Sequence, residues 1–495
     1  MKNLSKEFCP QREIFDFPEK ALFFGTGVLL RGLPLYFIDK ANKNGVFKGR
    51  VVVVKSTDKG DISAYARQDN CFTTVVRGEE KGKSIMENEV NYAISRVLTA
   101  ADEWSDILEF ARSPNLNLVV SNTTEVGITY VDEDFMAGPP SSFPGKLLAV
   151  LYERYQAFKG DPAKGLGIVP TELVSENGDQ LRHILLRHVE RNGLETGFRH
   201  WLLTANHFCN SLVDRIVPGE IKGALKDKLE AELGYQDDLM IMAEPYRLWA
   251  IEGDAQVKEL LSFAQIDEGV KVVPSIADYK ELKLRLLNAP HTFCCGVAYL
   301  SGHSSVKAAM KDSNFVHFME GIMSQEIALC LPKHIEKEQI KAFSETVLDR
   351  FRNEFLDHQW LSISTNYTTK MKMRCVGLIE NWYQNSAEVP HYMAFAFAAY
   401  IRFMKAVDRQ GNGFQGEASQ GCYTINDSEA SLLASIWADA SLNMSAKVQV
   451  ILSQIGLWGS DLSSLPGFAK TVERYLEHML ADRPITLKAW KNIVA

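Results

Sequence analysis

The hydrophobic positions in the first half of the chain form short, uninterrupted runs separated by longer amphipathic segments. These runs predict strands at Lys20–Phe24, Val51–Val54, Leu116–Val120 and Gly167–Val169. Between them the pattern predicts helices from Val28 to about Lys40, in a long segment near Glu87–Ala111, and over Lys146–Phe158. A run without polar positions, such as the four valines, is typical of a parallel strand covered on both faces. Strands that recur between helices therefore predict an α/β fold with a Rossmann-like, doubly wound parallel sheet.

After about residue 275 the strand pattern stops and apolar positions recur at helical spacing. The predicted helices are Tyr279–Leu287, Glu345–Phe355, Val376–Tyr383, His391–Ala406, Ser428–Ala438, Ala446–Leu457 and Phe468–Leu480. The polar, glycine-rich segment Gln410–Cys422 is predicted to be a loop. We therefore expect two domains: a Rossmann-like, dinucleotide-binding domain over residues 1–275, and a mainly α-helical domain over residues 276–495 that binds substrate and carries catalytic residues.

Composition narrows the class of protein. The 495 residues suit two or three domains, and a hydrophobic share of 46% excludes wholesale disorder. The net charge of -8 argues against a nucleic-acid partner. The eight cysteines show no repeated CxxC spacing, and neither a signal core nor an apolar run of about 20 residues is present. We expect a cytoplasmic protein with reduced thiols and no membrane partner; its oligomeric state stays open.

A two-glycine turn follows the first predicted strand. Gly25 and Gly27 permit a tight turn there, and they let backbone N–H groups approach a diphosphate at the start of the next helix. The third glycine of the usual dinucleotide fingerprint would fall at Leu30 and is missing, so Arg31 is a candidate phosphate ligand. A plain strand-to-helix turn explains so short a motif about as well. Its position at the first βα turn favours a dinucleotide.

Polar residues also follow the next two predicted strands, and open α/β sheets bind ligands at the carboxyl ends of their strands. After the valine run, Asp58 would favour NAD by accepting ribose hydroxyls, whereas Lys55 would favour NADP, and the sequence leaves this choice open. After Leu116–Val120 come candidates for the nicotinamide side: Asn122, Thr123, Thr124 and Glu125. For any one of these four alone, capping the next helix is the better interpretation.

The segment 278–291 carries the densest set of reactive side chains. At about 100° per residue, Lys283, Asn288 and His291 fall within a helical arc of roughly 140°. One helix face would then present an amine, an amide and an imidazole together. Pro290 complicates this geometry, because proline removes a helical hydrogen bond. For the spacing alone, a solvated lysine and a core histidine remain the simpler interpretation.

Taken together, the motifs resemble a known family. Gly25-x-Gly27-x3-Arg31, Asn122–Glu125, Leu212–Ile216 and Lys283-x4-Asn288-x2-His291 occur in the order of the zinc-independent, long-chain polyol dehydrogenases of the mannitol dehydrogenase family. Further phrases are similar to the branch that reduces the keto-uronate tagaturonate to altronate with NADH: Ser121–Thr129, Glu172–Asp179, Leu212–Val217, Arg350–Asn353, His358-Gln359 and Thr369–Arg374. The alternatives are a fructuronate-reducing or mannitol-type enzyme and, in a different class, a dinucleotide-binding regulatory protein without catalysis.

The resemblance implies NAD as the cofactor, a sugar-acid substrate and no metal. It assigns Lys283 as the general acid/base and Asn288 as the hydrogen-bond donor to the substrate oxygen. His291 would orient the substrate and the lysine, and Asp214 would contribute to the polar wall around the substrate. The lysine needs burial or a neighbouring cation to act as a base near neutral pH, since a free lysine has a pKa near 10.4.

Two further features concern the substrate. Mannitol-type members carry a second asparagine for the oxygen, and Leu173, preceded by Glu172, stands in its place here. A keto-uronate also carries a carboxylate, which requires cationic partners when it is buried. Lys370 and Arg374 are the candidates, although a solvated basic helix face explains them equally well.

Overall fold

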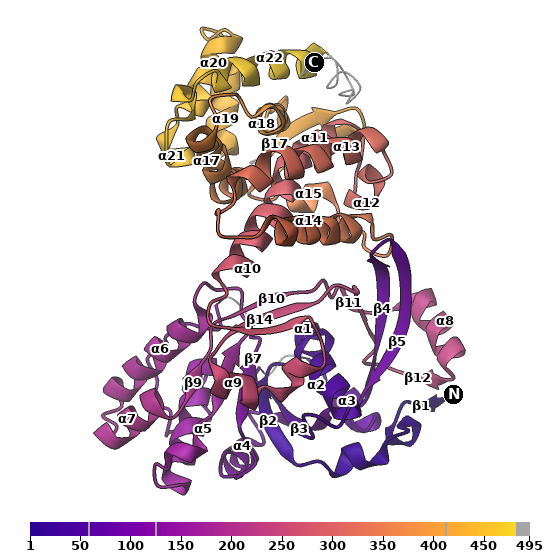
Figure 1. Ribbon diagram of the computed structural model, residues 1–495, viewed down its shortest axis with the longest axis vertical. Coiled ribbons are helices and arrows are strands. Elements are labelled where there is room, and N and C mark those ends of the chain that lie inside the picture. The colour runs from indigo at the N-terminus through magenta and orange to yellow at the C-terminus, as the bar shows by residue number, and fades with distance from the viewer. Residues whose placement is uncertain (58–59, 124–125, 411–412, 482–495) are drawn as a thin grey trace. The chain divides into compact units, whose positions relative to one another are not determined.

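The computed structural model describes residues 1–57, 60–123, 126–410 and 413–481. The chain forms two compact units, one of Met1–Gly78 with Ser84–Tyr279 and one of Glu79–Lys83 with Lys280–Ala495. The first contains most of the strands and the second is mainly helical (Figure 1). Over the described part of the chain, no helix combines the length and the apolar character needed to cross a bilayer.

A six-stranded parallel sheet forms the centre of the first unit. Its strands are β2 (Glu19–Phe24), β3 (Arg50–Lys55), β6 (Ile94–Thr99), β7 (Leu118–Ser121), β8 (Gly167–Pro170) and β9 (His207–Phe208). They lie in the order β6-β3-β2-β7-β8-β9, and all neighbours are parallel. The chain moves outward from β2 to β6 and then returns to start β7 beside β2. This order confirms the predicted doubly wound sheet and places its switch point between β2 and β7.

Successive side chains of these strands enter two different cores. Phe23 and Val53 belong to the core that includes α2 (Pro34–Lys43), whereas Phe24 and Val54 belong to the core that includes α5 (Phe143–Ala157). Because both faces are covered by helices, alternate positions are equally buried. The four-valine run therefore needs no polar residue, as the sequence pattern predicted.

The predicted helix from Val28 to about Lys40 is divided in the structure. α1 (Val28–Gly32) ends before Leu33, whose φ of −133° is not helical, and α2 begins at Pro34. Proline has no N–H and its fixed φ suits the first position of a helix, so Pro34 starts a new helix rather than continuing the old one.

The long helix predicted near Glu87–Ala111 is wrong. That segment contains β5 (Lys83–Asn91), β6 and only a short helix, α4 (Trp104–Ala111). With β4 (Phe72–Glu80), β5 forms a long ribbon in the sheet β11-β13-β4-β5, whose other strands are Gly219–Glu220 and Ile241–Ala243 (Figure 1). β5 is an edge strand with mostly exposed side chains, and such a strand carries charges instead of an apolar run.

The remaining elements of the first unit surround this framework. The strands are β1 (Lys2–Asn3), β10 (Ser211–Asp214), β12 (Tyr235–Gln236), β14 (Leu248–Glu252) and β15 (Val270–Val273). The helices are α3 (Ser63–Arg67), α6 (Asn177–Arg191), α7 (Thr196–Thr204), α8 (Gly223–Leu233) and α9 (Ala255–Leu260). β10, β14 and β15 form a separate three-stranded sheet.

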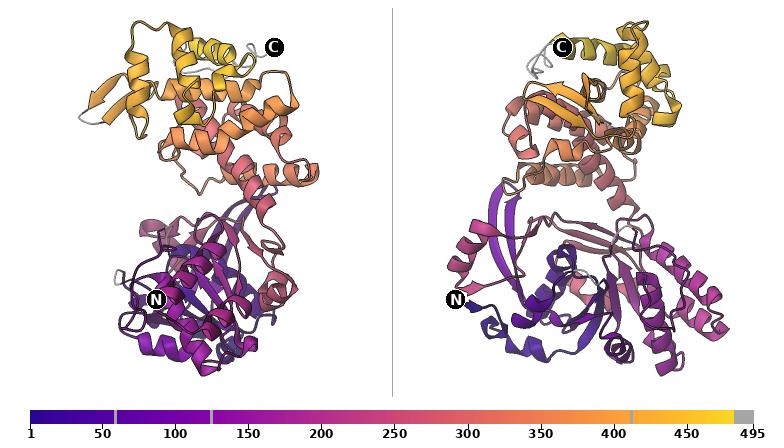
Figure 2. Two further views of the ribbon diagram at one scale, coloured as in Figure 1. Left: turned by 90° about the vertical axis from the view of Figure 1, so that its left-hand side faces the viewer. Right: turned by 180° about the vertical axis from the view of Figure 1, so that it is seen from behind.

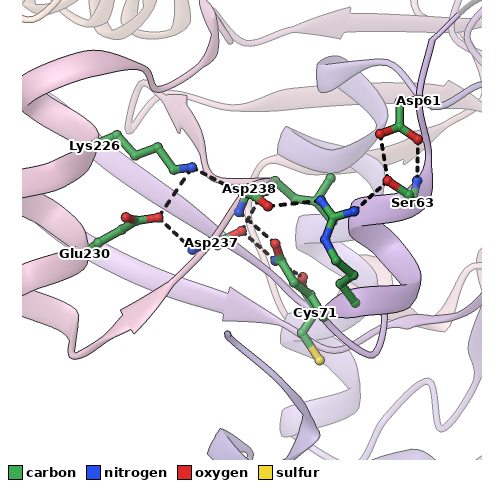
Figure 3. A network of polar contacts seen from close by, with 10 residues as sticks. Asp61, Ser63, Cys71, Lys226, Glu230, Asp237 and Asp238 are labelled. Atoms are coloured by element: carbon green, nitrogen blue, oxygen red, sulfur yellow. Dashed lines mark hydrogen bonds and ion pairs between the residues drawn. The ribbon is translucent and has the colours of Figure 1, made fainter. Parts of the chain in front are cut away.

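A buried carboxylate joins distant segments of this unit (Figure 3). Asp237, which is fully buried, accepts hydrogen bonds from the Gln68 amide at 2.8 Å and from the backbone N–H groups of Thr73 at 2.6 Å and Leu239 at 2.8 Å. The bonds connect the end of α3 and the start of β4 to the segment after β12. Asp237 thus satisfies three donors that have little access to water.

Replacing Asp237 with alanine is expected to destabilise the protein by about 3 kcal/mol or more, because each buried donor left unpaired costs roughly 1–3 kcal/mol. Its neighbour Asp238 offers a matched control, since it forms exposed ion pairs with Arg67 and Lys226. Asp238→Ala is expected to cost at most about 1 kcal/mol. Urea unfolding of the two variants measures the difference, and equal losses would contradict the role of Asp237.

The second unit is built on two buried helices. α18 (His391–Phe403) is buried at every residue after His391, and it packs against α11 (Ala289–Leu300). A Cβ on Gly296 of α11 would lie 2.9 Å from the Ala399 carbonyl oxygen. The two backbones are therefore in close contact at this glycine.

The other elements of the second unit surround this pair. The continuous run before α11 is α10 (Ala277–Leu282) and a π-helical turn, η5 (Lys283–Asn288). The other helices include α12 (Val306–Ala309), α13 (Ser313–Gly321), the π turn η6 (Ile322–Glu326), α14 (Lys337–Arg352), α15 (Trp360–Ile363), α16 (Tyr367–Lys370), the π turn η8 (Met371–Val376), α17 (Gly377–Asn385), α19 (Ala430–Ala438), α20 (Met444–Leu452), α21 (Ile455–Trp458) and α22 (Phe468–Ala481).

The loop predicted at Gln410–Cys422 is instead a small antiparallel sheet. Its strands are β16 (Asp408–Gln410), β17 (Gly413–Ala418) and β18 (Gly421–Ile425), visible at the edge of the helical unit in the left view of Figure 2. Gly421, at the start of β18, has a φ of +117°, a conformation that favours glycine. Two residues later, buried Tyr423 donates a hydrogen bond to the Phe403 carbonyl at 2.7 Å and anchors the sheet.

A buried glutamate caps α18. The Glu326 carboxylate accepts the backbone N–H groups of Tyr392 and Met393, each at 2.8 Å, and burial raises the pKa of Glu326 to about 8. The folded state therefore binds this proton more tightly than the unfolded state. The resulting stability is fully present below the ordinary pKa of 4.5 and is lost as pH rises through about 8.

We accordingly expect the Tm to fall as pH rises from about 5 to about 9, and we expect Glu326→Gln to remove most of this dependence. Differential scanning calorimetry of both proteins across this range is the measurement. The same slope in both proteins would show that another group controls the effect.

Candidate active site

The two-glycine turn lies at the switch point of the central sheet. Gly25 has a φ of +124°, and its N–H donates to the Val54 carbonyl at 2.9 Å. A Cβ at Gly25 would lie 2.6 Å from the Asn122 carbonyl oxygen, so only glycine fits. At Gly27, which precedes α1, the nearest atom to such a Cβ would be the Asn122 side-chain oxygen at 3.9 Å. The loops after β2 and β7 are thus brought together, with room beside Gly27.

A buried carboxylate holds the loop after β7. Thr123 donates to one oxygen of Glu172 through its backbone N–H and its hydroxyl, both at 2.9 Å, and Ser121 donates to the other oxygen at 3.0 Å. The Asn122 amide donates to the Thr171 hydroxyl at 3.0 Å. Glu172 therefore fixes the backbone at this edge of the sheet. The candidates Asp58, Thr124 and Glu125 lie outside the described residues.

The contacts of Arg31 do not support the role of phosphate ligand that the sequence suggested for it. Its side chain is buried, and one guanidinium nitrogen donates to the Leu239 carbonyl at 2.5 Å. Another lies 3.5 Å from the Glu220 carboxylate, and the group faces the ring of Phe72 at 5.8 Å. These contacts tie α1 to distant parts of the same unit, so we do not include Arg31 in the cofactor site.

Asp214 lies buried at the end of β10. The next residue of the same phrase, Arg215, donates to the carbonyl oxygens of Gly32 at 2.6 Å and Glu244 at 2.9 Å. Burial lowers the pKa of Arg215 to about 10. Arg215 therefore connects β10 to the end of α1, while Asp214 remains a candidate for the substrate site.

In the second unit, the two main catalytic candidates are the first and last residues of a π turn. Lys283 begins η5, Asn288 ends it, and both are half-buried. The Ala289 N–H donates to the Leu284 carbonyl, five residues back, as in a π-helix. Pro290 follows directly and has no N–H to donate. The arc calculated for a regular α-helix therefore does not apply here.

Asn288 is linked to Arg374 through Thr292. The Thr292 hydroxyl donates to the Asn288 carbonyl at 2.9 Å and accepts a hydrogen bond from the Arg374 guanidinium at 3.3 Å. Thr292 is fully buried. Within the described part of the chain, the Asn288 amide itself has no hydrogen-bond partner, which leaves it available for a ligand.

His291 is held among aromatic rings. It stacks on Phe351 with ring centroids 4.1 Å apart, and it meets His358 and Trp360 edge to face at 5.3 and 6.1 Å. Burial lowers the pKa of His291 well below its usual value, and neighbouring positive groups including His358 and Arg374 act in the same direction. Its surroundings therefore favour the neutral form of the imidazole.

Lys370 and Arg374 lie close enough to His291 to influence its titration. The Lys370 ammonium donates to the Ile363 carbonyl at 2.8 Å, and its pKa is lowered first by burial and then by Arg374. Across the described residues, neither Lys370 nor Arg374 is paired with a carboxylate. Half-buried cations without acidic partners suit an anionic ligand.

Three residues near these candidates were given no site role from the sequence: Arg285, Thr292 and His358. A spacing signal existed for Arg285, because Glu281 stands four residues earlier and pairs with it at 2.8 Å. Thr292 stands four residues after Asn288, the spacing of a hydroxyl that bonds back to a helical carbonyl.

Among the described residues, no group of three or more His, Cys, Asp or Glu side chains is arranged to hold a metal. Cys294 and Cys295 are both buried: the first thiol lies 3.7 Å from the Met319 sulfur, and the second donates to the Trp360 carbonyl at 3.3 Å. These contacts give both thiols a packing role inside the helical unit.

Two domains of one known family match this chain. Residues 19–264 match the mannitol dehydrogenase Rossmann domain, and residues 275–480 match the mannitol dehydrogenase C-terminal domain. This chain belongs to the mannitol dehydrogenase family. The resemblance inferred from the sequence motifs is thereby confirmed, and the protein is an oxidoreductase of this family.

Within the mannitol dehydrogenase family, several similar curated relatives share one name. The altronate oxidoreductase of Halalkalibacterium halodurans is 36% identical over 94% of this chain and 92% of its own length. The altronate oxidoreductase of Bacillus subtilis is 34% identical over 94% of this chain and 93% of its own length. That of Yersinia pestis is also 34% identical, over 97% of this chain and 98% of its own length.

Solved structures share the fold at lower identity. The mannitol 2-dehydrogenase of Pseudomonas fluorescens, solved as a ternary complex with NAD and D-mannitol, is 22% identical with a TM-score of 0.69, covering 99% of this chain and 100% of its own. A substrate-free D-sorbitol dehydrogenase is 19% identical with a TM-score of 0.73, covering 94% of both chains. These likenesses support the family fold.

Proposed function

We propose that this mannitol dehydrogenase family member is an NAD-dependent altronate oxidoreductase, which interconverts tagaturonate and altronate. The observation that carries the choice of a sugar acid is the pair Lys370 and Arg374, whose cations face no carboxylate among the described residues and lie near His291. The name shared by the relatives, over nearly the whole chain, supports the same substrate.

The edge of the central sheet fits the cofactor. Gly25 allows the loops after β2 and β7 to approach each other, and Gly27 leaves space at the start of α1. We assign Gly25, Gly27, Asn122 and Thr123 to the cofactor site, together with the sequence candidates Asp58, Thr124 and Glu125. NAD carries the hydride that is added to the ketone carbon or removed from the alcohol carbon.

Lys283 and Asn288 of η5 serve the proton transfer to and from the substrate oxygen. In reduction, the Lys283 ammonium donates a proton to the ketone oxygen; in oxidation, the neutral amine accepts the hydroxyl proton. The unpaired Asn288 amide donates a hydrogen bond to the same oxygen and stabilises the charge that develops there. His291, being neutral, orients the substrate by hydrogen bonding without adding charge. Asp214 contributes to the polar wall of the substrate site.

The substrate carboxylate binds Lys370 and Arg374. The guanidinium offers two parallel donors that match a carboxylate, and the ammonium adds a point charge. A neutral ketose lacks this group and cannot gain these contacts. Leu173, which is 64% exposed, stands where mannitol-type enzymes have a second asparagine, in keeping with a branch that recognises its substrate differently.

A substrate panel tests the proposal. NADH consumption with tagaturonate, fructuronate and fructose is compared by kcat/KM, and each assay is repeated with NADPH. We expect the highest value for tagaturonate with NADH. A higher value for fructuronate or fructose would assign the corresponding alternative, and no turnover with any of them would favour a non-catalytic nucleotide-binding protein.

A further inference from the structure

Of the three π turns described in the helical unit, two carry proposed site residues. η5 begins with Lys283 and ends with Asn288, and η8 (Met371–Val376) follows Lys370 directly and contains Arg374. π-helical residues make up well under 1% of globular proteins, and they often occur at functional sites. One turn therefore carries the proton-transfer group, and the other carries the carboxylate ligand.

Arg285 connects the two π turns through the main chain. Its guanidinium donates to the carbonyl oxygen of Arg374 at 3.0 Å and is held on its other side by Glu281 at 2.8 Å. It also lies against Gly377, where a Cβ would be 3.5 Å from its terminal nitrogen. The backbone of Arg374 is thereby attached to the turn that contains Lys283.

Thr292 connects the same two turns through a side chain. Its hydroxyl accepts from the Arg374 guanidinium at 3.3 Å while donating to the Asn288 carbonyl at 2.9 Å. Its own carbonyl accepts from the Tyr367 hydroxyl at 2.8 Å, and that hydroxyl also accepts the Gly296 N–H at 2.9 Å. Arg374 is thus fixed at both its backbone and its guanidinium.

We propose that Arg285 and Thr292 are positioning residues that set the spacing between Lys283 and Arg374, and so select ketones that carry a carboxylate at a fixed distance from the carbonyl. Neither residue needs to touch the substrate for this role. The inference rests on the proposed function and deepens it, because it assigns sugar-acid selectivity to the contact between two π turns.

The test uses Thr292→Val, which keeps the shape of the side chain and removes both hydrogen bonds of the hydroxyl. The measured quantity is the ratio of kcat/KM for tagaturonate to kcat/KM for fructose. We expect the ratio to fall about tenfold in Thr292→Val, the value of one hydrogen bond to a charged group, and to recover in Thr292→Ser. Arg285→Met is expected to lower the ratio in the same direction.

Thr346→Val is the matched control. Thr346 lies on α14, and its hydroxyl donates to the Ala342 carbonyl four residues back at 2.9 Å, as Thr292 does to Asn288. Among the described residues, its hydroxyl forms no hydrogen bond with a proposed site residue. We expect its ratio to equal that of the wild type.

A double-mutant cycle shows whether Thr292 acts through Arg374. If it does, Thr292→Val adds little to the loss of selectivity in Arg374→Met. Full additivity, or an equal fall in kcat/KM for both substrates, would overturn the inference. A wild type without preference for tagaturonate would overturn the proposed function as well, whereas a selective wild type with an unchanged Thr292→Val ratio would overturn the inference alone.

Discussion

Lys283→Met is expected to lower kcat for tagaturonate reduction by about 10²–10⁴-fold, the contribution typical of a general acid/base. The methionine side chain has no group that can donate a proton to the ketone oxygen. NADH binding should be nearly unchanged, because Lys283 belongs to the helical unit and the proposed cofactor residues belong to the sheet unit. Steady-state rates and a fluorescence titration with NADH measure the two effects separately.

Lys341→Met provides the control for the loss of a lysine. Lys341 lies on the exposed face of α14, with 79% of its side chain accessible, and its ion pair with Glu345 is long at 3.9 Å. Its replacement should leave kcat unchanged. Substantial turnover by Lys283→Met would remove this lysine from the mechanism, and loss of NADH binding would indicate a wider structural effect.

Arg374→Met is expected to raise KM for tagaturonate by about 10–100-fold, since a hydrogen bond to a charged group contributes about 1.5–3 kcal/mol and each 1.4 kcal/mol corresponds to a factor of ten. The methionine keeps much of the apolar stem but cannot bind a carboxylate. For fructose, which has no carboxylate, KM should change much less. Initial rates with both substrates over a wide concentration range provide the comparison.

Lys372 offers a control on the same π turn. It lies two residues before Arg374, is exposed, and donates to the Gly456 carbonyl at 3.2 Å. Lys372→Met removes a positive charge from the turn without altering the proposed carboxylate site, so both KM values should stay near those of the wild type. An equal rise in KM for tagaturonate and fructose in Arg374→Met would refute its specific role.

The central sheet was predictable because its strands are buried on both faces. Burial leaves an uninterrupted apolar run such as Val51–Val54, and the order of such runs along the chain indicates parallel pairing. The ribbon of β4 and β5 was not predicted. Its exposed, charged positions such as Lys83 and Glu87 arise from its place at a sheet edge, which only the tertiary structure determines.

Part of the candidate site was predictable from motifs that directly follow predicted strands. Gly25 and Asn122 could be placed together because both follow parallel strands of one sheet. The burial of Arg31 could not be foreseen, since its partner Leu239 is 208 residues away. Pro290 indicated an irregular helix, but which turn would widen depends on the packing around it.

The close contact of α11 with α18 at Gly296 has a consequence for substrate binding. The half of this helical run after His291 packs against the buried helix α18, whereas the half before it contains the wider turn η5. The spacing of residues 283–288 from η8 therefore depends on bonds such as the one from Arg285 to the Arg374 carbonyl, and the amides of this turn are expected to open more readily than those after His291. Hydrogen exchange should show faster amide opening there than in the segment that follows.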